Sequence, residues 1–333
     1  MAFPLAILAT EKKTESWIYS NFIQTCLDLD LYKSPVPYYY YIFDYTISPY
    51  LEIQKLKRDT SDRMFTNVIE FLDICIDLDY YIYLNVDEYY IPHRENTFIK
   101  HFSHDVLING IDSEAKELSV YGFTDKRKLE CITVKFKDFN NAYNHIKEIE
   151  KDLLQITLYR FNSEAEFTFD LNGFIEQLDE YLYGKNSSLR FSPLRTPWDR
   201  IYGIKACDYL INYMEECISQ NIKIEIIIFQ FLYEYHALMK YRIEFLLENK
   251  ILKNRDILKK WDGVLKSCMI IRNYFLKADV KGAIDKNINS VKSIVSDMFM
   301  NEKIILNELL DILKGKAVHS NKALNSTRRV IAN

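Results

Sequence analysis

Apolar side chains in the first part of the chain follow two different periods. Residues 17–29 and 62–77 carry apolar side chains at helical spacing. Between them, residues 34–48 contain two prolines and a run of tyrosines, which indicates extended chain. A helix is also expected to begin at residue 138. Antiparallel strands are expected at 80–91, 104–111, 117–123 and 131–136. Helices combined with antiparallel strands in this order predict an α+β fold.

The second part of the chain shows the helical period throughout. Its first two expected helices are separated by a loop that contains the last two prolines of the chain. At the other end, the segment 314–333 has five basic residues and no acid, so we expect a frayed basic tail. We therefore divide the chain into residues 1–145, with mixed elements, and residues 146–333, an all-helical domain. The expected helices are 172–182, 209–217, 224–250, 256–278, 286–300 and 302–313.

Composition narrows the possible functions. The 333 residues carry a net charge of −4, so no overall basic field attracts nucleic acid. Only 8 glycines are present and none builds a nucleotide-binding loop. The 6 cysteines form no C-x-x-C pair, which favours reduced thiols. With no secretory signal or membrane span expected either, we place the protein in the cytoplasm.

Histidines are the most informative candidates for chemistry. His93, His101 and His104 lie within twelve residues, a spacing that suits zinc but suits solvated loop histidines better, so we expect no metal. His104 begins an apolar strand directly after a loop, where an imidazole can act as a base. Asp87 and Glu88 are expected to be solvated charges at a strand edge. His236 lies in an apolar helix and is expected in the core.

The segment HDVLINGIDSEAKELSVYGF, which begins at His104, resembles the histidine-containing β-hairpin of papain-fold cysteine enzymes, such as double-glycine leader peptidases. It is more similar to the papain-like acyltransferase of butirosin biosynthesis and to carrier-protein-dependent amide synthetases, including that of closthioamide biosynthesis. The segment FDLNGFIEQLDEYLYGKNSS resembles a recurrent helix and loop after the core of these proteins. The resemblance implies a papain-like core, made of an N-terminal helix and an antiparallel sheet, followed by an all-helical domain.

The resemblance also implies particular site residues. An active-site cysteine is expected on the first helix, where Cys26 is the only cysteine, and Ser20 is the alternative nearer the helix start. His104 matches the histidine of the hairpin and would act as general base. Relatives carry Asp or Asn near the position of Gly122, so Asp125 is expected to orient the imidazole instead, unless the enzyme works as a dyad.

The implied activity is amide formation in specialised metabolism, such as the biosynthesis of nonribosomal peptide antibiotics. An acyl group would pass from an acyl or peptidyl carrier protein, through the cysteine, to a small amine. The chain itself would hold no cofactor, because the phosphopantetheine belongs to the partner. The basic segments 250–260 and 314–333 either dock the acidic carrier protein or are ordinary solvated faces.

Two other functions remain open. The first is a catalytically inactive papain-like protein that serves as a binding partner or scaffold in such a pathway. The second is a cysteine peptidase, in which water accepts the acyl group. The helical half either covers the active site or mediates formation of a homodimer.

Overall fold

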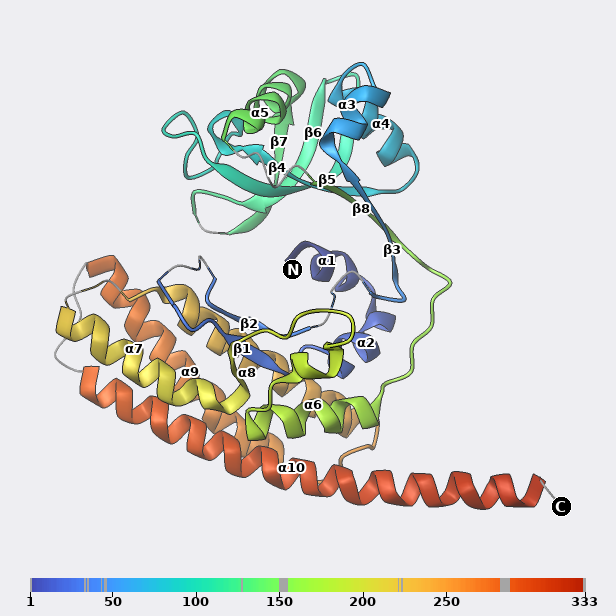
Figure 1. Ribbon diagram of the computed structural model, residues 1–333, viewed down its shortest axis with the longest axis vertical. Helices are drawn as coiled ribbons and strands as arrows, with labels where there is room; N and C mark the ends of the chain where they lie inside the picture. The colour runs from blue at the N-terminus through green and yellow to red at the C-terminus, as the bar shows by residue number, and fades with distance from the viewer. Residues whose placement is uncertain are drawn as a thin grey trace. The chain divides into compact units, whose positions relative to one another are not determined.

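The chain forms two compact units in a computed structural model (Figure 1). Unit 1 comprises Met1–Glu15 and Asp44–Phe167, and unit 2 comprises Ser16–Phe43 and Thr168–Asn333. The structure describes every residue except 1, 33, 35, 43, 45–46, 127, 150–154, 221, 223, 282–287 and 332–333, and it describes only the backbone of 2 and 317–331. Helices, antiparallel sheets and a helical C-terminal region are all present, as the α+β prediction requires.

The division expected at residue 145 is wrong. That residue lies inside helix α5 (Phe136–Ile149), and the following strand β8 (Gln155–Phe161) pairs with two strands of the unit 1 sheet. Near the N-terminus, residues 16–43 belong to unit 2 instead of unit 1. Local periodicity could not reveal either fact, because both depend on pairing between segments that are distant in the sequence.

Unit 1 is built around a six-stranded sheet in which every pair of neighbouring strands is antiparallel. Its strand order is β3-β8-β4-β5-β6-β7. The predicted strands 104–111 and 117–123 form the β5–β6 hairpin. Two strands, β3 and β8, were not expected. The remaining bounds are β3 (Leu51–Lys57), β4 (Tyr81–Asp87), β5 (Ser103–Asp112), β6 (Glu117–Phe123) and β7 (Leu129–Lys135).

Two helices cover one face of this sheet. Apolar residues of α4 (Val68–Asp77) and α5 share one core with alternate residues of the central strands, such as Leu84 and Val106. The helix expected at 62–77 is interrupted, because Asn67 caps α4 by accepting a hydrogen bond from the Glu70 N–H. The part before this break belongs to α3 (Arg58–Met64). The N-terminal helix α1 (Ala2–Leu8) places Phe3 against Tyr83 with ring centroids 5.7 Å apart and is followed by the 3-10 turn η1 (Lys12–Thr14).

Unit 2 contains a small sheet in the order β2-β1-β9. The helix expected at 17–29 ends early: α2 (Glu15–Ser20) stops before Phe22, whose φ of 56° interrupts the helix. Residues 25–27 are then a strand buried between two partners, so their apolar character reflects a sheet interior and not a helix face. The strands are β1 (Thr25–Leu27), β2 (Tyr38–Tyr40) and β9 (Ile201–Tyr202).

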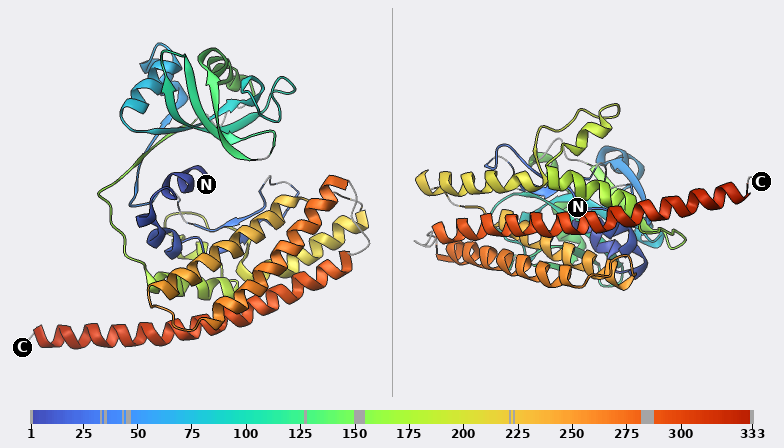
Figure 2. Two further views of the ribbon diagram at one scale, coloured as in Figure 1. Left: turned by 180° about the vertical axis from the view of Figure 1, so that it is seen from behind. Right: turned by 90° about the horizontal axis from the view of Figure 1, so that it is seen from below.

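The rest of unit 2 is helical, and Figure 2 shows its long helices α8, α9 and α10 running side by side. Two helices and a frayed tail were expected after residue 286. Instead, the single helix α10 continues to Ile331. Its buried Glu302 contacts the core residue His236. The elements are α6 (Leu171–Tyr183), η3 (Ser187–Phe191), η4 (Gly203–Lys205), α7 (Ala206–Gln220), α8 (Ile226–Glu248), α9 (Asp256–Lys281) and α10 (Ile288–Ile331).

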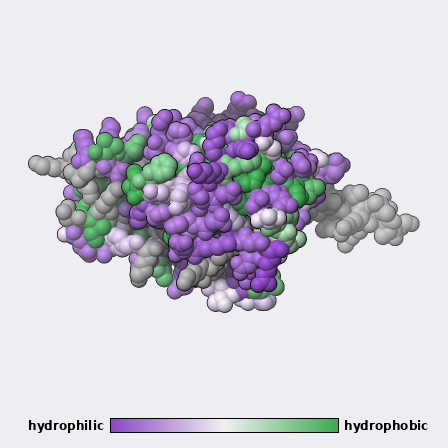
Figure 3. Space-filling view, turned by 90° about the horizontal axis from the view of Figure 1, so that it is seen from above, coloured by the Kyte–Doolittle hydropathy of each residue, from purple (hydrophilic) through white to green (hydrophobic). Residues whose placement is uncertain are grey.

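The surface seen in Figure 3 is largely hydrophilic, with smaller hydrophobic areas among the polar side chains. Exposed apolar residues in unit 1 include Met64 at the end of α3, Ile74 in α4 and Leu78 directly after α4. Within the described ranges, every helix is too short or too polar to span a bilayer.

Candidate functional site

Two adjacent acids at the end of β4 form the centre of the candidate site in unit 1. Asp87 is the last residue of β4 and Glu88 the first of the 3-10 turn η2 (Glu88–Tyr90). One oxygen of Asp87, Oδ1, accepts the backbone N–H groups of Tyr89 at 3.1 Å and Phe102 at 3.2 Å. The Glu88 N–H donates to the Phe102 carbonyl. Both acids are buried, which contradicts their expected role as solvated edge charges.

Glu88 holds His104, the histidine of the hairpin. The two side chains meet through Glu88 Oε1 and His104 Nδ1, 2.9 Å apart, and Asn96 donates to the other oxygen of Glu88. The Nε2 of His104 lies 3.7 Å from Asp105 Oδ1, and the side chain is 35% exposed. The imidazole is therefore fixed by one nitrogen and open to proton exchange at the other.

The same contacts shift the protonation of both partners. The hydrogen bond to Glu88 raises the pKa of His104 above its ordinary value, and partial burial opposes this only in part. Burial acts to raise the pKa of Glu88, but the hydrogen bonds from His104 and Asn96 outweigh it, so that pKa is lowered. This pair has the arrangement of a general base and its orienting acid.

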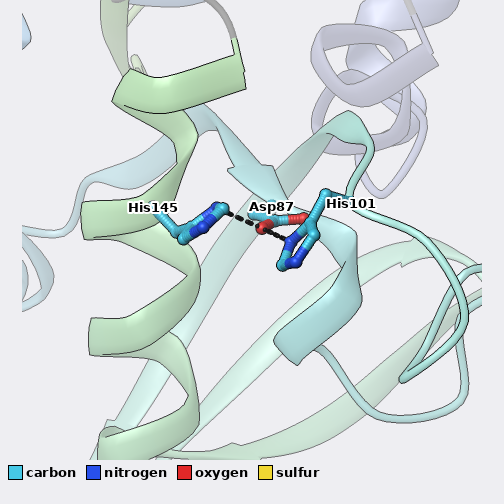
Figure 4. Close-up of side chains that lie close together, drawn as sticks. All are labelled: Asp87, His101 and His145. Carbon is cyan, nitrogen blue, oxygen red and sulfur yellow. Dashed lines mark hydrogen bonds and ion pairs between the residues drawn. The ribbon is translucent and has the colours of Figure 1, made fainter.

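Asp87 holds the other two histidines of the site, as Figure 4 shows. His101 Nδ1 lies 2.7 Å and His145 Nδ1 2.8 Å from the same carboxylate oxygen, Oδ2. His101 comes from the segment between η2 and β5, whereas His145 comes from α5. These three side chains form the Asp87 cluster, whose members offer ligand atoms within 4.8 Å of one another.

Gly122 leaves room for a buried arginine. A Cβ atom at this position would overlap the guanidinium of Arg94, which also donates a hydrogen bond to the carbonyl of Phe123. A side chain at residue 122 would therefore require the Arg94 guanidinium to move. The orienting role expected for Asp125 is wrong, because Asp125 is exposed and the acid that lies within hydrogen-bond distance of His104 is Glu88.

Cys26 is not placed as a papain-like nucleophile. It lies in a strand, β1, and is fully buried beside Tyr41 and Tyr202. Burial raises the pKa of the Cys26 thiol to about 12, so the thiolate is scarce at neutral pH. The expected position on the first helix is wrong because that helix ends at Ser20.

The alternative nucleophile Ser20 has a structural role. Its hydroxyl donates to the Ser16 carbonyl at 2.7 Å and accepts the Asp170 N–H at 2.8 Å, so it connects α2 to the residue that caps α6. The two cysteines of unit 1 have other surroundings: Cys75 is buried in the core on α4, and Cys131 Sγ lies 3.6 Å from Asn109 Oδ1.

The expected docking segments are only partly described. In the segment 250–260, Lys259 contacts Asp256 and Lys260 contacts Glu308, as on an ordinary charged helix surface. Lys314 contacts Asp179, whereas the side chains beyond residue 316 lie outside the described residues.

The structure separates the three histidines that were considered for zinc. His93 is exposed, His101 contacts Asp87 and His104 contacts Glu88. The histidine that completes the Asp87 cluster, His145, was missed, because it follows forty-odd residues later on a helix. A usable signal was nevertheless present: two consecutive acids end an apolar strand immediately before a segment rich in histidine.

No protein-family model matches this chain, and no curated protein matches it either. The function proposed below therefore rests on the geometry of the site and on the resemblance of the hairpin segment.

Proposed function

We propose that unit 1 is a papain-like domain that transfers an acyl group from a carrier-protein thioester to a small amine, with His104 as general base. The observation that carries this proposal is the 2.9 Å contact between Glu88 and His104 at the start of the hairpin. An imidazole fixed through Nδ1 by a carboxylate is suited to exchange a proton through Nε2. Glu88 takes the orienting role that was expected of Asp125.

The proposed reaction is direct and forms no acyl-enzyme. His104 Nε2 removes a proton from the attacking amine as its nitrogen forms a bond to the thioester carbonyl carbon. The tetrahedral intermediate then collapses, the carbon–sulfur bond breaks, and the proton returns from His104 to the departing thiolate. The products are an amide and the phosphopantetheine thiol of the carrier protein.

A direct reaction is preferred to a cysteine-linked one because of the surroundings of Cys26. A fully buried thiol with a pKa of about 12 supplies little nucleophile. The same argument weakens the cysteine peptidase alternative, which needs the same thiolate. A thioester is reactive enough for a neutral amine to attack once a base is in place.

The test is an amide-forming assay with acyl groups loaded on a panel of carrier proteins and a panel of small primary amines, read by mass spectrometry. Activity is expected in the unmodified chain and in Cys26→Ala. His104→Ala should lower the rate by about 10²- to 10⁴-fold, the usual contribution of a general base. His93→Ala, in an exposed histidine of the same segment, is the matched control. Loss of activity in Cys26→Ala would contradict the direct reaction.

A non-catalytic role as a binding partner or scaffold is the second candidate. The observation that favours it is that Cys26 and Ser20, the two nucleophiles expected from the resemblance, are both buried in unit 2 with structural partners. This candidate predicts that carrier proteins bind the chain without turnover, and that His104→Ala leaves their affinity unchanged.

A further inference from the structure

The Asp87 cluster is an arrangement that the proposed acyl transfer does not use. The carboxylate of Asp87 is fully buried, and backbone N–H groups hold its Oδ1. This leaves Oδ2 directed at two imidazole nitrogens, 2.7 Å from His101 and 2.8 Å from His145. One oxygen thus faces two nitrogens from different parts of the chain (Figure 4).

The contacts of His145 distinguish its two ring nitrogens. Its Nε2 lies 3.2 Å from Glu148 Oε2, a contact that a proton on Nε2 would satisfy. Nδ1 would then present a lone pair. This nitrogen is buried and makes no hydrogen bond within the described chain, although Asp87 Oδ2 is close to it. Two lone pairs that face each other are stabilised by a cation between them.

Stacking fixes the two imidazoles that face Asp87. The rings of His101 and His145 are stacked with centroids 4.3 Å apart, and Tyr89 stacks on the other side of His101 at 4.4 Å. The stacking limits rotation of His101, so the nitrogen that faces Asp87 is held in place.

We infer that the Asp87 cluster is a binding site for a divalent transition metal ion, with Asp87 Oδ2, His101 Nδ1 and His145 Nδ1 as ligands. Two imidazoles and one carboxylate are a donor set suited to Zn²⁺ and unsuited to Mg²⁺ or Ca²⁺, which prefer oxygen. Ligand atoms lie about 2.0–2.2 Å from a Zn²⁺ ion. When they are arranged tetrahedrally around it, neighbouring ligand atoms are about 3.3 Å apart. The oxygen–nitrogen contacts must therefore open by roughly half an ångström on binding.

Further features fit such a site. The contact between His145 and Glu148 is the carboxylate–histidine pairing that commonly orients a metal-bound imidazole. The His101 side chain is 45% exposed, so water or an exogenous ligand can reach the ion as a fourth partner. His104 has different contacts, which are with Glu88 and Asp105.

The test uses the full chain, stripped of metal with a chelator and titrated with Zn²⁺ or Co²⁺ in competition with a chromophoric chelator. One equivalent should bind, and the Co²⁺ form should show visible d–d bands without a cobalt–thiolate band, because all ligands are nitrogen or oxygen. His101→Ala and His145→Ala should each weaken binding by more than about 100-fold, whereas His93→Ala should leave it unchanged. Mg²⁺ should not compete.

A milder variant keeps the test decisive if an alanine variant fails to fold. Glu148 is 73% exposed, so Glu148→Gln should fold normally and weaken Zn²⁺ binding by about 10- to 100-fold. Absence of a bound equivalent in the unmodified chain would overturn the inference. Unchanged affinity in His101→Ala and His145→Ala, or a thiolate band with Co²⁺, would overturn it as well.

Discussion

At the scale of single residues, the contact between Glu88 and His104 governs how unit 1 responds to pH. Glu88→Gln removes the charge that stabilises the imidazolium, so the pKa of His104 should fall toward its ordinary value of about 6.5. A histidine NMR titration of the full chain measures this shift. Asp125→Asn, in an exposed acid after β6, is the control and should leave the His104 pKa unchanged.

The same pair defines a pH window for stability. The folded pKa of His104 is raised, so its contribution is complete below about pH 6.5 and is lost as pH rises through the folded pKa. The folded pKa of Glu88 is lowered, so its contribution is complete above about pH 4.5 and is lost as pH falls through the folded pKa. Both contributions are complete between these values.

Urea denaturation should therefore show the largest effect of Glu88→Gln near pH 5.5. There the free energy of unfolding should decrease by about 1–2 kcal/mol, toward the low end for a hydrogen bond between charged groups because His104 is partly exposed. At pH 8.5 the decrease should be smaller. An effect that grows from pH 5.5 to 8.5 would contradict the assigned ion pair.

Cysteine reactivity provides a further residue-scale prediction. Because Cys26 is fully buried with a raised pKa, it should resist iodoacetamide at pH 7.5 in the folded chain, whereas the exposed Cys131 should be alkylated at least ten times faster. Peptide mass spectrometry resolves the two sites, and urea-unfolded protein provides the control in which both react. If Cys26 were labelled first, the case against a cysteine nucleophile would fail.

The sequence identified one half of the acid–base pair and not the other. His104 was recognisable because it follows a loop and begins an apolar strand, which is a local signal. Glu88 was not recognisable as its partner, since the pairing arises where β4 ends beside the start of β5. The raised pKa of Cys26 was equally hidden, because it depends on burial between β2 and β9.

At the scale of elements, α8 and α10 are joined by a buried polar contact. His236 Nε2 lies 3.2 Å from Glu302 Oε1, both side chains are fully buried, and Tyr181 donates to the same glutamate oxygen. Glu302→Leu would leave His236 and Tyr181 without this partner. The free energy of unfolding should decrease by about 3–5 kcal/mol.

A double variant separates the loss of this contact from the loss of packing. Adding His236→Leu to Glu302→Leu should recover part of the lost stability, because no polar ring nitrogen is then left unpaired in the core. Urea denaturation of the two single variants and the double variant gives the interaction free energy. Strictly additive effects would show that the two side chains do not stabilise each other.

Among the elements, those with a strong local period were predictable. Strand 117–123 and the helix at 172–182 agree with β6 and α6 to within a residue at each end. The helix expected at 17–29 was wrong because a short strand buried on both sides is as apolar as a helix face. Three residues are too few to show whether apolar positions repeat with the period of a strand or of a helix.

At the scale of the whole molecule, two units with separate hydrophobic cores should unfold in separable steps. Glu302→Leu should lower the midpoint of the unit 2 transition by several degrees and leave that of unit 1 nearly unchanged. Calorimetry, with hydrogen exchange to assign each transition, measures this. A single transition that shifts as one would contradict the independence of the units.

The composition of each unit could not be predicted from the sequence. Both boundaries near the N-terminus fall where the local pattern does not change character, and the third follows β8, a strand recognisable only through its pairing with β3 and β4. What the sequence did reveal was the helical character of residues from 171 onward, since that part depends on local periodicity.

The discontinuous make-up of unit 2 has a consequence for the order of events on the ribosome. Translation delivers residues 16–43 first, yet β1 requires β9, which emerges more than 150 residues later. Unit 1 is complete in the meantime and can fold while that early segment still lacks its partners. The nascent chain must therefore keep an apolar, strand-forming stretch from aggregating until its second half has been synthesised.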